Sequence, residues 1–131
     1  MAGYSGTPLP KKLGIKQSSR VAAIDAPPEF AGLVDGVALS SQLRGRFDVI
    51  VFFTTDRKKL ERRLGALTRA LEQNGGLWIA WPKKASKVPT DMTEDVVREV
   101  ALPTGLVDNK VCAIDDVWSG LRLVIRVEHR L

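Results

Sequence analysis

The chain has 131 residues, of which 44% are hydrophobic, enough apolar material for one domain with one core. Lysine and arginine number 20 against 15 aspartate and glutamate, a net charge of +5. The longest apolar runs, 49–53 and 77–81, fall far short of the roughly 18 residues that a membrane-spanning helix needs. The first residues lack the apolar segment of a signal peptide. The composition thus argues against a membrane protein and predicts a cytoplasmic location.

The N-terminal part predicts an arm with a short helix, residues 1–16, ahead of a single Rossmann-like domain, residues 17–131. Residues 7–14 carry a threonine cap, prolines in the first turn and a closing glycine, a combination that is typical of a very short helix. Residues 20–25, with the apolar run 21–24 at their centre, are the expected first strand. A brief helix and a weak second strand are expected after it, at 29–34 and 37–39.

A strand, a helix and a second strand are most clearly marked in the middle of the chain. Residues 49–53 are apolar at every position, which suits a strand buried on both faces of a parallel sheet. Leucines then recur at helical spacing after Asp56, a good N-cap, and charged residues occupy the other faces. Asn74-Gly75-Gly76 is expected to end this helix, and 77–81 to form the next buried strand. A crossover of this kind is right-handed.

The last third of the chain predicts a helix and a closing antiparallel hairpin. Residues 91–94 resemble a capping box at the start of the helix. Strands are expected at 107–114 and 121–127, and in the second of them apolar and polar residues alternate, as they do where an antiparallel strand enters a sheet. The predicted fold is therefore a three-layer, Rossmann-like α/β sheet, mostly parallel with an antiparallel C-terminal hairpin.

Two resemblances to known families follow from these elements. The order strand, helix, Gly-Gly, strand, opened by Asp48, resembles the second half of class I methyltransferases that use S-adenosylmethionine. With its closing hairpin, the chain resembles a trimmed member of that fold that lacks one strand and one helix of the first half. It also resembles a bacterial domain family of unknown function through these segments: YSGTPL (4–9), WPKKAS (81–86), TEDVVR (93–98), GLVDNKVCAID (105–115) and WSGL (118–121).

The turn after the first strand departs from the methyltransferase pattern. In dinucleotide-binding and methyltransferase folds this turn is rich in glycine, because only glycine lets the backbone approach the cofactor closely. Here the turn is Asp25-Ala26-Pro27-Pro28-Glu29. Proline has no amide hydrogen to donate and cannot adopt positive φ. The sequence therefore predicts no cofactor, and in particular no ordinary affinity for S-adenosylmethionine, NAD or FAD.

Candidate ligand-binding residues lie where predicted strands end. Asp25 and Asp115 each follow a strand, and ligands of open α/β sheets bind outside the carboxyl ends of parallel strands. The alternative role of both carboxylates is to cap the loops that follow them. Trp118, in the hairpin turn, is either a lid over the crevice or a hydrophobic plug.

A second group of candidates lies in the loop that leaves strand 77–81. Three lysines and a serine hydroxyl in this loop are suited to hold an anion such as a phosphate or a carboxylate, and a tryptophan beside them is suited to flank a planar group. The alternative is that these lysines are simply solvated. The residues are Trp81, Lys83, Lys84, Ser86 and Lys87.

The residues that commonly carry catalysis or bind metals are scarce. His129 is the only histidine and Cys112 the only cysteine, which gives little support to Ser-His-Asp catalysis or to a zinc site. His129 is expected to be solvated, and Cys112 to be a buried, inert thiol rather than a reactive one. The sequence predicts neither a catalytic residue nor a metal.

Three classes of function remain open. The leading hypothesis is a non-catalytic Rossmann-like module, not an enzyme, that binds a small anionic metabolite or a protein partner. The first alternative is an S-adenosylmethionine-dependent methyltransferase with an altered cofactor loop. The second is a nucleic-acid-associated regulator, which is supported only by the basic residues of 56–73. No membrane partner is expected.

Overall fold

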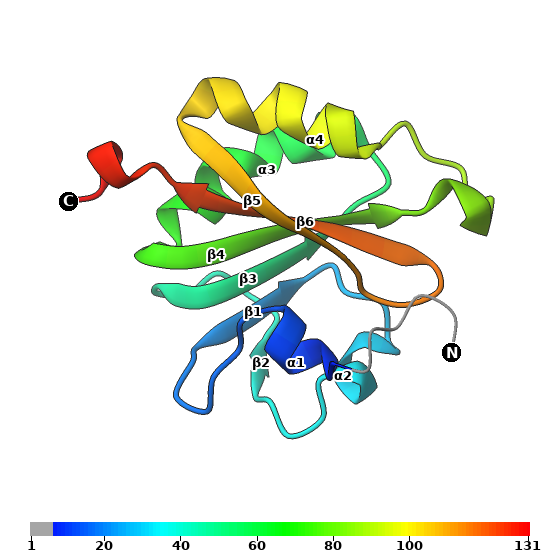
Figure 1. The fold of residues 1–131 in the computed structure, drawn as a ribbon, viewed down its shortest axis with the longest axis horizontal. Coiled ribbons are helices and arrows are strands. Elements are labelled where there is room, and N and C mark those ends of the chain that lie inside the picture. The colour runs from blue at the N-terminus through cyan, green and yellow to red at the C-terminus, as the bar shows by residue number, and fades with distance from the viewer. Residues whose placement is uncertain (1–6) are drawn as a thin grey trace.

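A mixed sheet organises residues 7–131, the part of the chain that this computed structural model describes (Figure 1). Its strands are β1 Val21–Ile24, β2 Leu39–Ser40, β3 Phe47–Phe53, β4 Leu71–Pro82, β5 Leu106–Ala113 and β6 Trp118–Ile125. They lie in the order β2-β1-β3-β4-β6-β5. Strands β2, β1, β3 and β4 are parallel, and β6 pairs antiparallel with both β4 and β5. The predicted mostly parallel sheet with an antiparallel C-terminal hairpin is confirmed.

Helices cover both faces of the sheet, which gives the three predicted layers. The α-helices are α1 Leu9–Lys12, α2 Phe30–Leu33, α3 Arg57–Arg69 and α4 Glu94–Ala101. Single 3₁₀ turns follow at Lys84–Ser86, Leu102–Thr104 and Val127–His129. Figure 1 shows α3 and α4 side by side on one face and the two shorter helices on the other. Within residues 7–131, every helix is too short or too polar to cross a membrane.

Side chains alternate along each strand and so build two separate apolar clusters. On one face, Ile50, Ile79 and Trp81 belong to a cluster that also holds the leucines of α3 and the buried residues of α4. On the other face, Val51 and Trp78 belong to a cluster that includes buried residues from the chain around α1 and α2. Because the middle strands are buried on both faces, they are apolar at consecutive positions.

Trp78 ties the N-terminal helix to the sheet. Its side chain is fully buried, and its indole Nε1 donates a hydrogen bond to the carbonyl oxygen of Leu13 over 3.1 Å. Leu13, directly after α1, is itself fully buried. Residues 1–6 of the expected N-terminal arm lie outside the described residues.

The predicted cap of α3 at Asp56 is confirmed, but the capping box predicted at 91–94 is not the one that starts α4. Asp91 Oδ1 instead accepts a hydrogen bond from the Arg57 amide over 2.8 Å, and Thr93 caps α4. The Asp56 side chain accepts a hydrogen bond from the Lys58 amide over 2.9 Å at the start of α3. Thr93 Oγ1 accepts one from the Val96 amide over 3.1 Å at the start of α4. Each cap satisfies an amide that has no partner within its helix.

The predicted end of α3 at residues 74–76 is wrong, because these residues lie within β4. The strand already begins at Leu71, which pairs with Phe47. Leu71 continues the helical spacing of leucines and is buried, so the pattern did not separate the helix from the strand. The glycines instead permit close packing, since a Cβ atom at Gly75 would lie 2.8 Å from the carbonyl oxygen of Asp48.

Candidate functional site

The carboxyl ends of β1, β3 and β4 lie along one edge of the sheet, where ligands of this architecture bind. A cavity of about 420 Å³ opens at this edge beside β1 and β2. It is lined by the turn 25–28, by Phe30 and Ala31, and by residues 39–41 at the end of β2. Its volume falls within the range of roughly 300–1,000 Å³ that small-molecule sites occupy. We refer to it as the β1–β2 cavity.

Asp25 gives the turn after β1 its shape. Its φ angle is +57°, so this aspartate adopts the left-handed conformation that a glycine usually supplies. The prolines that follow therefore do not prevent the chain from reversing direction. The Asp25 carboxylate is 39% exposed, and its Oδ2 lies 2.7 Å from Nζ of Lys59 in the first turns of α3. The turn thus offers the β1–β2 cavity a carboxylate where related folds offer amides.

Residues 83–87 follow β4 and carry three lysines, and we call them the lysine loop. This loop lies next to the hairpin turn between β5 and β6. The Lys83 amide donates to the carbonyl oxygen of Val117 over 2.7 Å, which extends the pairing of β4 with β6. Lys84 and Lys87 are exposed and Lys83 is partly buried. Ser86 is already engaged, because its hydroxyl donates to the Lys83 carbonyl over 2.6 Å. The loop therefore presents lysines, and not a serine hydroxyl, to solvent.

Trp81 does not lie beside these lysines as a platform for a ligand. Only 6% of it is exposed, and it belongs to the core cluster on the α3 and α4 face. Strand alternation turns its ring into the core, so neither face of the ring is available to a planar group. This corrects the role that the sequence suggested for Trp81.

Asp115 and Trp118 hold the hairpin turn together. Asp115 Oδ1 accepts hydrogen bonds from the amides of Val117 and Trp118, each over 2.8 Å, which is the capping role weighed above. The Trp118 ring packs edge-on against Phe53 with 5.1 Å between centroids, and Phe53 packs likewise on Phe30 at 5.0 Å. Trp118 is therefore a plug in the apolar cluster rather than a free lid.

The predicted site residues are thus brought to one edge but not into one cavity. Of them, Asp25 lines the β1–β2 cavity, while the lysine loop and the Asp115 turn lie farther along the edge, beyond Phe53. Sequence reasoning missed Lys59 and Ser41. A lysine paired with a carboxylate 34 positions earlier leaves no local signal, and the two-residue strand before Ser41 is too short to show a pattern.

A larger cavity, about 710 Å³, lies at the opposite edge of the sheet, among the end of α3 and the starts of β4 and β5. His129 lines it, far from the loops that leave the parallel strands. Cys112 is buried, as expected, and burial raises the pKa of its thiol while Lys12 and Lys110 act in the opposite direction. In the range 7–131, no cluster of three or more histidine, cysteine or carboxylate residues is arranged to hold a metal.

Comparison with solved structures identifies the architecture. The chain aligns with LepI solved with SAM (TM-score 0.57, 13% identity, 90% of this chain and 39% of that one). It aligns with a tRNA methyltransferase from B. subtilis at a TM-score of 0.56 and 13% identity, over 92% of this chain and 66% of that one. It also aligns with an S-adenosylmethionine-dependent methyltransferase from Clostridium acetobutylicum at a TM-score of 0.54 and 10% identity, over 86% of this chain and 76% of that one. The chain has the methyltransferase fold. It spans less than two thirds of the length of the first two of these proteins.

No family model and no curated protein matches the chain, so the resemblance to a bacterial domain family has no support of that kind. The comparison with solved structures corrects the expectation that the chain is not an enzyme, because it points to methyltransferases. That expectation rested on the scarcity of catalytic side chains. Methyl transfer depends little on them, since the cofactor carries the reactive group and the protein mainly positions it.

Proposed function

We propose that this chain is an S-adenosylmethionine-dependent methyltransferase with an altered cofactor loop, and that the β1–β2 cavity receives the cofactor. The cavity's position supports this proposal. In the sheet, β2 lies on one side of β1, and β3 and β4 lie on the other side. The strand order therefore reverses at β1. Cofactors of open α/β sheets bind at such a point.

The observation that carries the proposal is the ion pair between Asp25 and Lys59 at this point. The methionine end of S-adenosylmethionine is a zwitterion with an ammonium and a carboxylate. Asp25 offers a carboxylate to the ammonium, and Lys59 offers an ammonium to the carboxylate. Side-chain charges thereby take the place of the backbone amides that a glycine-rich turn supplies.

The remaining walls suit the adenosyl part. Leu39 and Pro27, both partly exposed, provide an apolar surface for a base, and Ser41 provides an exposed hydroxyl for a sugar. Ser40 is less available, because its hydroxyl donates to the carbonyl oxygen of Gln42 over 2.7 Å. When bound, the cofactor supplies an activated methyl group. The chain's part is to orient that group and to keep water from it.

We expect the affinity to be weaker than micromolar. Pro27 and Pro28 remove two amide donors from the turn, and a hydrogen bond to a charged group is worth about 1.5–3 kcal/mol. A calorimetric dissociation constant in the micromolar range would show that Pro27 and Pro28 do not weaken the affinity for S-adenosylmethionine.

Thermal shift with S-adenosylmethionine tests the proposal. We expect millimolar cofactor to raise the melting temperature of the parent, and Asp25→Asn or Lys59→Gln to remove most of that rise. Without cofactor, both variants are expected to melt close to the parent, because an exposed ion pair contributes about 1 kcal/mol or less. Lys58→Gln, an exposed lysine of the same helix, is the matched control. No rise with the parent, or an equal rise in all four proteins, overturns the assignment.

The lysine loop extends the proposal to the methyl acceptor or partner, which we infer to be anionic. Lys83, Lys84 and Lys87 bring positive charge to the same edge of the sheet as the β1–β2 cavity.

Citrate is a suitable probe of the lysine loop, since it is anionic and carries a hydroxyl donor. We expect Lys83→Ala/Lys84→Ala to weaken citrate binding and its salt dependence in an NMR titration, while stability changes by no more than about 0.5 kcal/mol. The control Lys58→Ala/Arg62→Ala removes the same charge from α3. Equal citrate binding by the parent and the loop variant would show that these lysines do not bind the anion. Unfolding of the loop variant would show that they stabilise the fold instead.

A further inference from the structure

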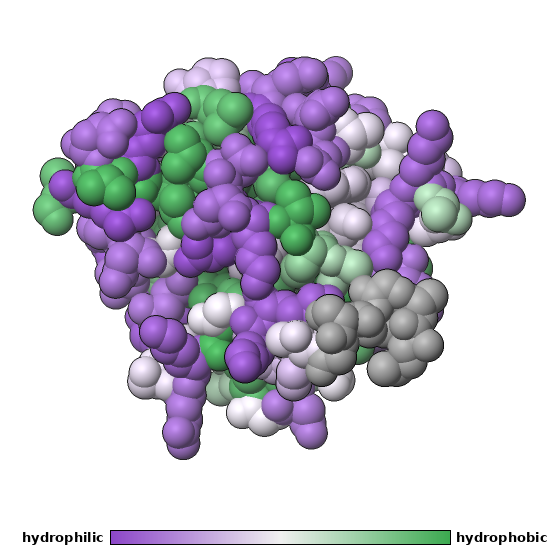
Figure 2. Space-filling model, viewed as in Figure 1, coloured by the Kyte–Doolittle hydropathy of each residue, from purple (hydrophilic) through white to green (hydrophobic). Residues whose placement is uncertain are grey.

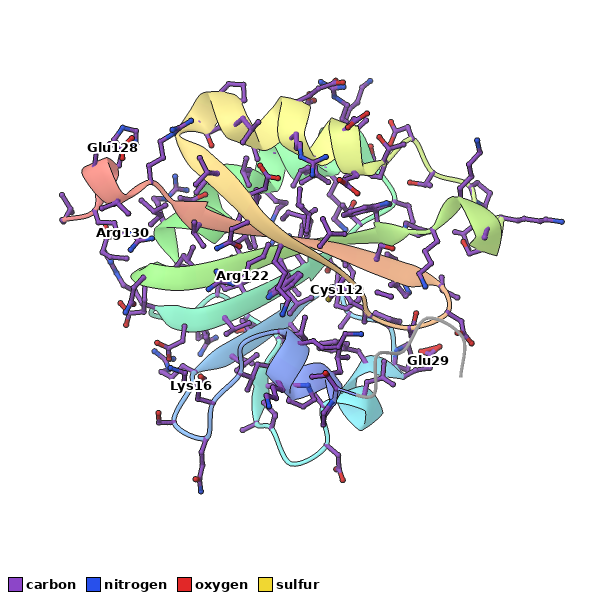
Figure 3. The ribbon with its side chains drawn as sticks, in the orientation of Figure 1. Lys16, Glu29, Cys112, Arg122, Glu128 and Arg130 are labelled. Carbon is purple, nitrogen blue, oxygen red and sulfur yellow. The ribbon has the colours of Figure 1, made fainter. Side chains whose placement is uncertain are left out.

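A second group of cations lies on the sheet face opposite α3 and α4. Between α1 and the strands β5 and β6, a cavity of about 240 Å³ is lined by Lys11, Lys12, Gly14, Asn109, Lys110 and Arg122. Within residues 7–131, no carboxylate lines it. Figure 3 shows Arg122 over the middle of this face, above α1, and Figure 2 shows hydrophilic side chains gathered there. We call Lys11, Lys110 and Arg122 the basic cluster.

A β-bulge explains why the acidic neighbour of Lys110 is missing from this face. Leu106 and Asp108 face α4, where Asp108 Oδ2 accepts a hydrogen bond from Nε of Arg98 over 3.0 Å. The register shifts between Asp108 and Lys110, so Lys110 lies on the opposite face together with Cys112. An extra residue in a strand redirects the side chains beyond it. Here it separates a carboxylate from an ammonium only two positions away.

The same register sets two like charges opposite each other. Lys110 pairs directly with Arg122 across β5 and β6. Such a pair is unfavourable by itself. Lys110 Nζ donates to the Lys12 carbonyl oxygen over 2.8 Å, which directs it toward α1. Arg122 has no ion pair with any described residue, and burial, with a smaller effect from Arg130, lowers its pKa.

Room for the guanidinium comes from β4. A Cβ atom at Gly76 would collide with the Arg122 side chain, so the absence of one lets Arg122 lie flat across the sheet. Its planar group is thereby held half-buried rather than extended into solvent. A guanidinium fixed in this way presents paired N–H donors in one direction.

We propose that the basic cluster binds a phosphate group. The forked donors of Arg122 match two oxygens of one phosphate, and the ammonium groups of Lys110 and Lys11 supply the remaining charge. The small volume suits a single phosphate group rather than a large ligand. Carboxylates are absent from the lining, so nothing there repels a dianion. This site lies on a face of the sheet, apart from the β1–β2 cavity, and does not depend on the proposed methyl transfer.

Calorimetry with pyrophosphate, at constant ionic strength set with sodium chloride, tests the site. We expect Arg122→Gln and Lys110→Gln to bind pyrophosphate at least about tenfold more weakly than the parent, as for the loss of one charged hydrogen bond. Arg62→Gln is the matched control, since Arg62 is exposed on α3 and forms no ion pair within residues 7–131. Equal binding by all four proteins, equal loss in the control, or no binding by the parent would overturn the proposal.

Two further titrations distinguish the source of the phosphate group. Inorganic phosphate and a single-stranded RNA oligonucleotide are compared in the same four proteins. If RNA binds and the Arg122→Gln variant loses that binding, the group belongs to a nucleic acid. If phosphate and pyrophosphate bind and RNA does not, the group belongs to a small molecule. Both results support the site.

Discussion

Replacing Trp78 with alanine is expected to lower the free energy of unfolding by about 3–5 kcal/mol, the usual cost of removing a large aromatic side chain from a core. Trp78 is fully buried in the middle of β4, and its indole also holds the Leu13 carbonyl. The substitution therefore opens a cavity and leaves a buried acceptor without a donor. Denaturant titration followed by circular dichroism measures the change.

Two comparisons separate these causes. Trp78→Phe keeps an aromatic ring but removes the indole donor, so we expect the free energy of unfolding to fall by less than in Trp78→Ala. The unpaired Leu13 carbonyl accounts for roughly 1–3 kcal/mol of that fall. Trp118→Ala truncates a tryptophan that is only partly buried and is expected to cost less than Trp78→Ala. If Trp78→Ala were no worse than Trp118→Ala, the N-terminal segment would not be anchored through β4.

Gly75→Ala is expected to destabilise the protein by about 1–3 kcal/mol, although it adds only one methyl group. The new Cβ atom would lie 2.8 Å from the Asp48 carbonyl oxygen and 3.2 Å from that of Glu72. Both are backbone atoms, the first in β3 and the second in β4 itself, so β3 must move away from β4 and β4 must also distort locally. Thermal and denaturant unfolding of purified variants measure this cost.

Two other glycines serve as controls for Gly75→Ala. Gly32→Ala places a methyl group in α2 with nothing within 4 Å and no positive φ, so it is expected to leave the stability unchanged or raise it by up to about 1 kcal/mol. Gly76→Ala meets only the flexible Arg122 side chain, which it would displace from the basic cluster. A loss at Gly75 no larger than at Gly32 would contradict the close approach of β3 and β4.

Much of the fold could be predicted because its main elements leave local signals. The runs 49–53 and 77–81 are apolar throughout since both faces of β3 and β4 are covered, and Asp56 carries the capping oxygen that starts α3. For α4 the sequence indicated a cap within 91–94, but the residue that caps it is Thr93 and not Asp91. The end of α3 could not be predicted. Leu71 satisfies the helical period, and only its pairing with Phe47 makes it part of a strand.

The candidate sites were less predictable, because their geometry depends on contacts between distant residues. Asp25 could be identified at the end of a strand, but its partner Lys59 comes from α3. Trp81 was expected to flank a planar group but lies in the core, because a fully buried strand carries no polar alternation to show which way each ring points. The basic cluster depends on the bulge before Lys110, and nothing in Asp108-Asn109-Lys110 marks where the register shifts.

The two outer strands also bear on how the molecule meets copies of itself. The exposed edge at β2 consists of two paired residues, Leu39 and Ser40. The other edge, β5, is longer, but the bulge interrupts its hydrogen-bonding register and Lys110 adds charge beside the interruption. A regular, uncharged edge is what another chain needs in order to add a strand. The feature that separates Asp108 from Lys110 therefore also makes β5 a poor template for fibrous aggregation.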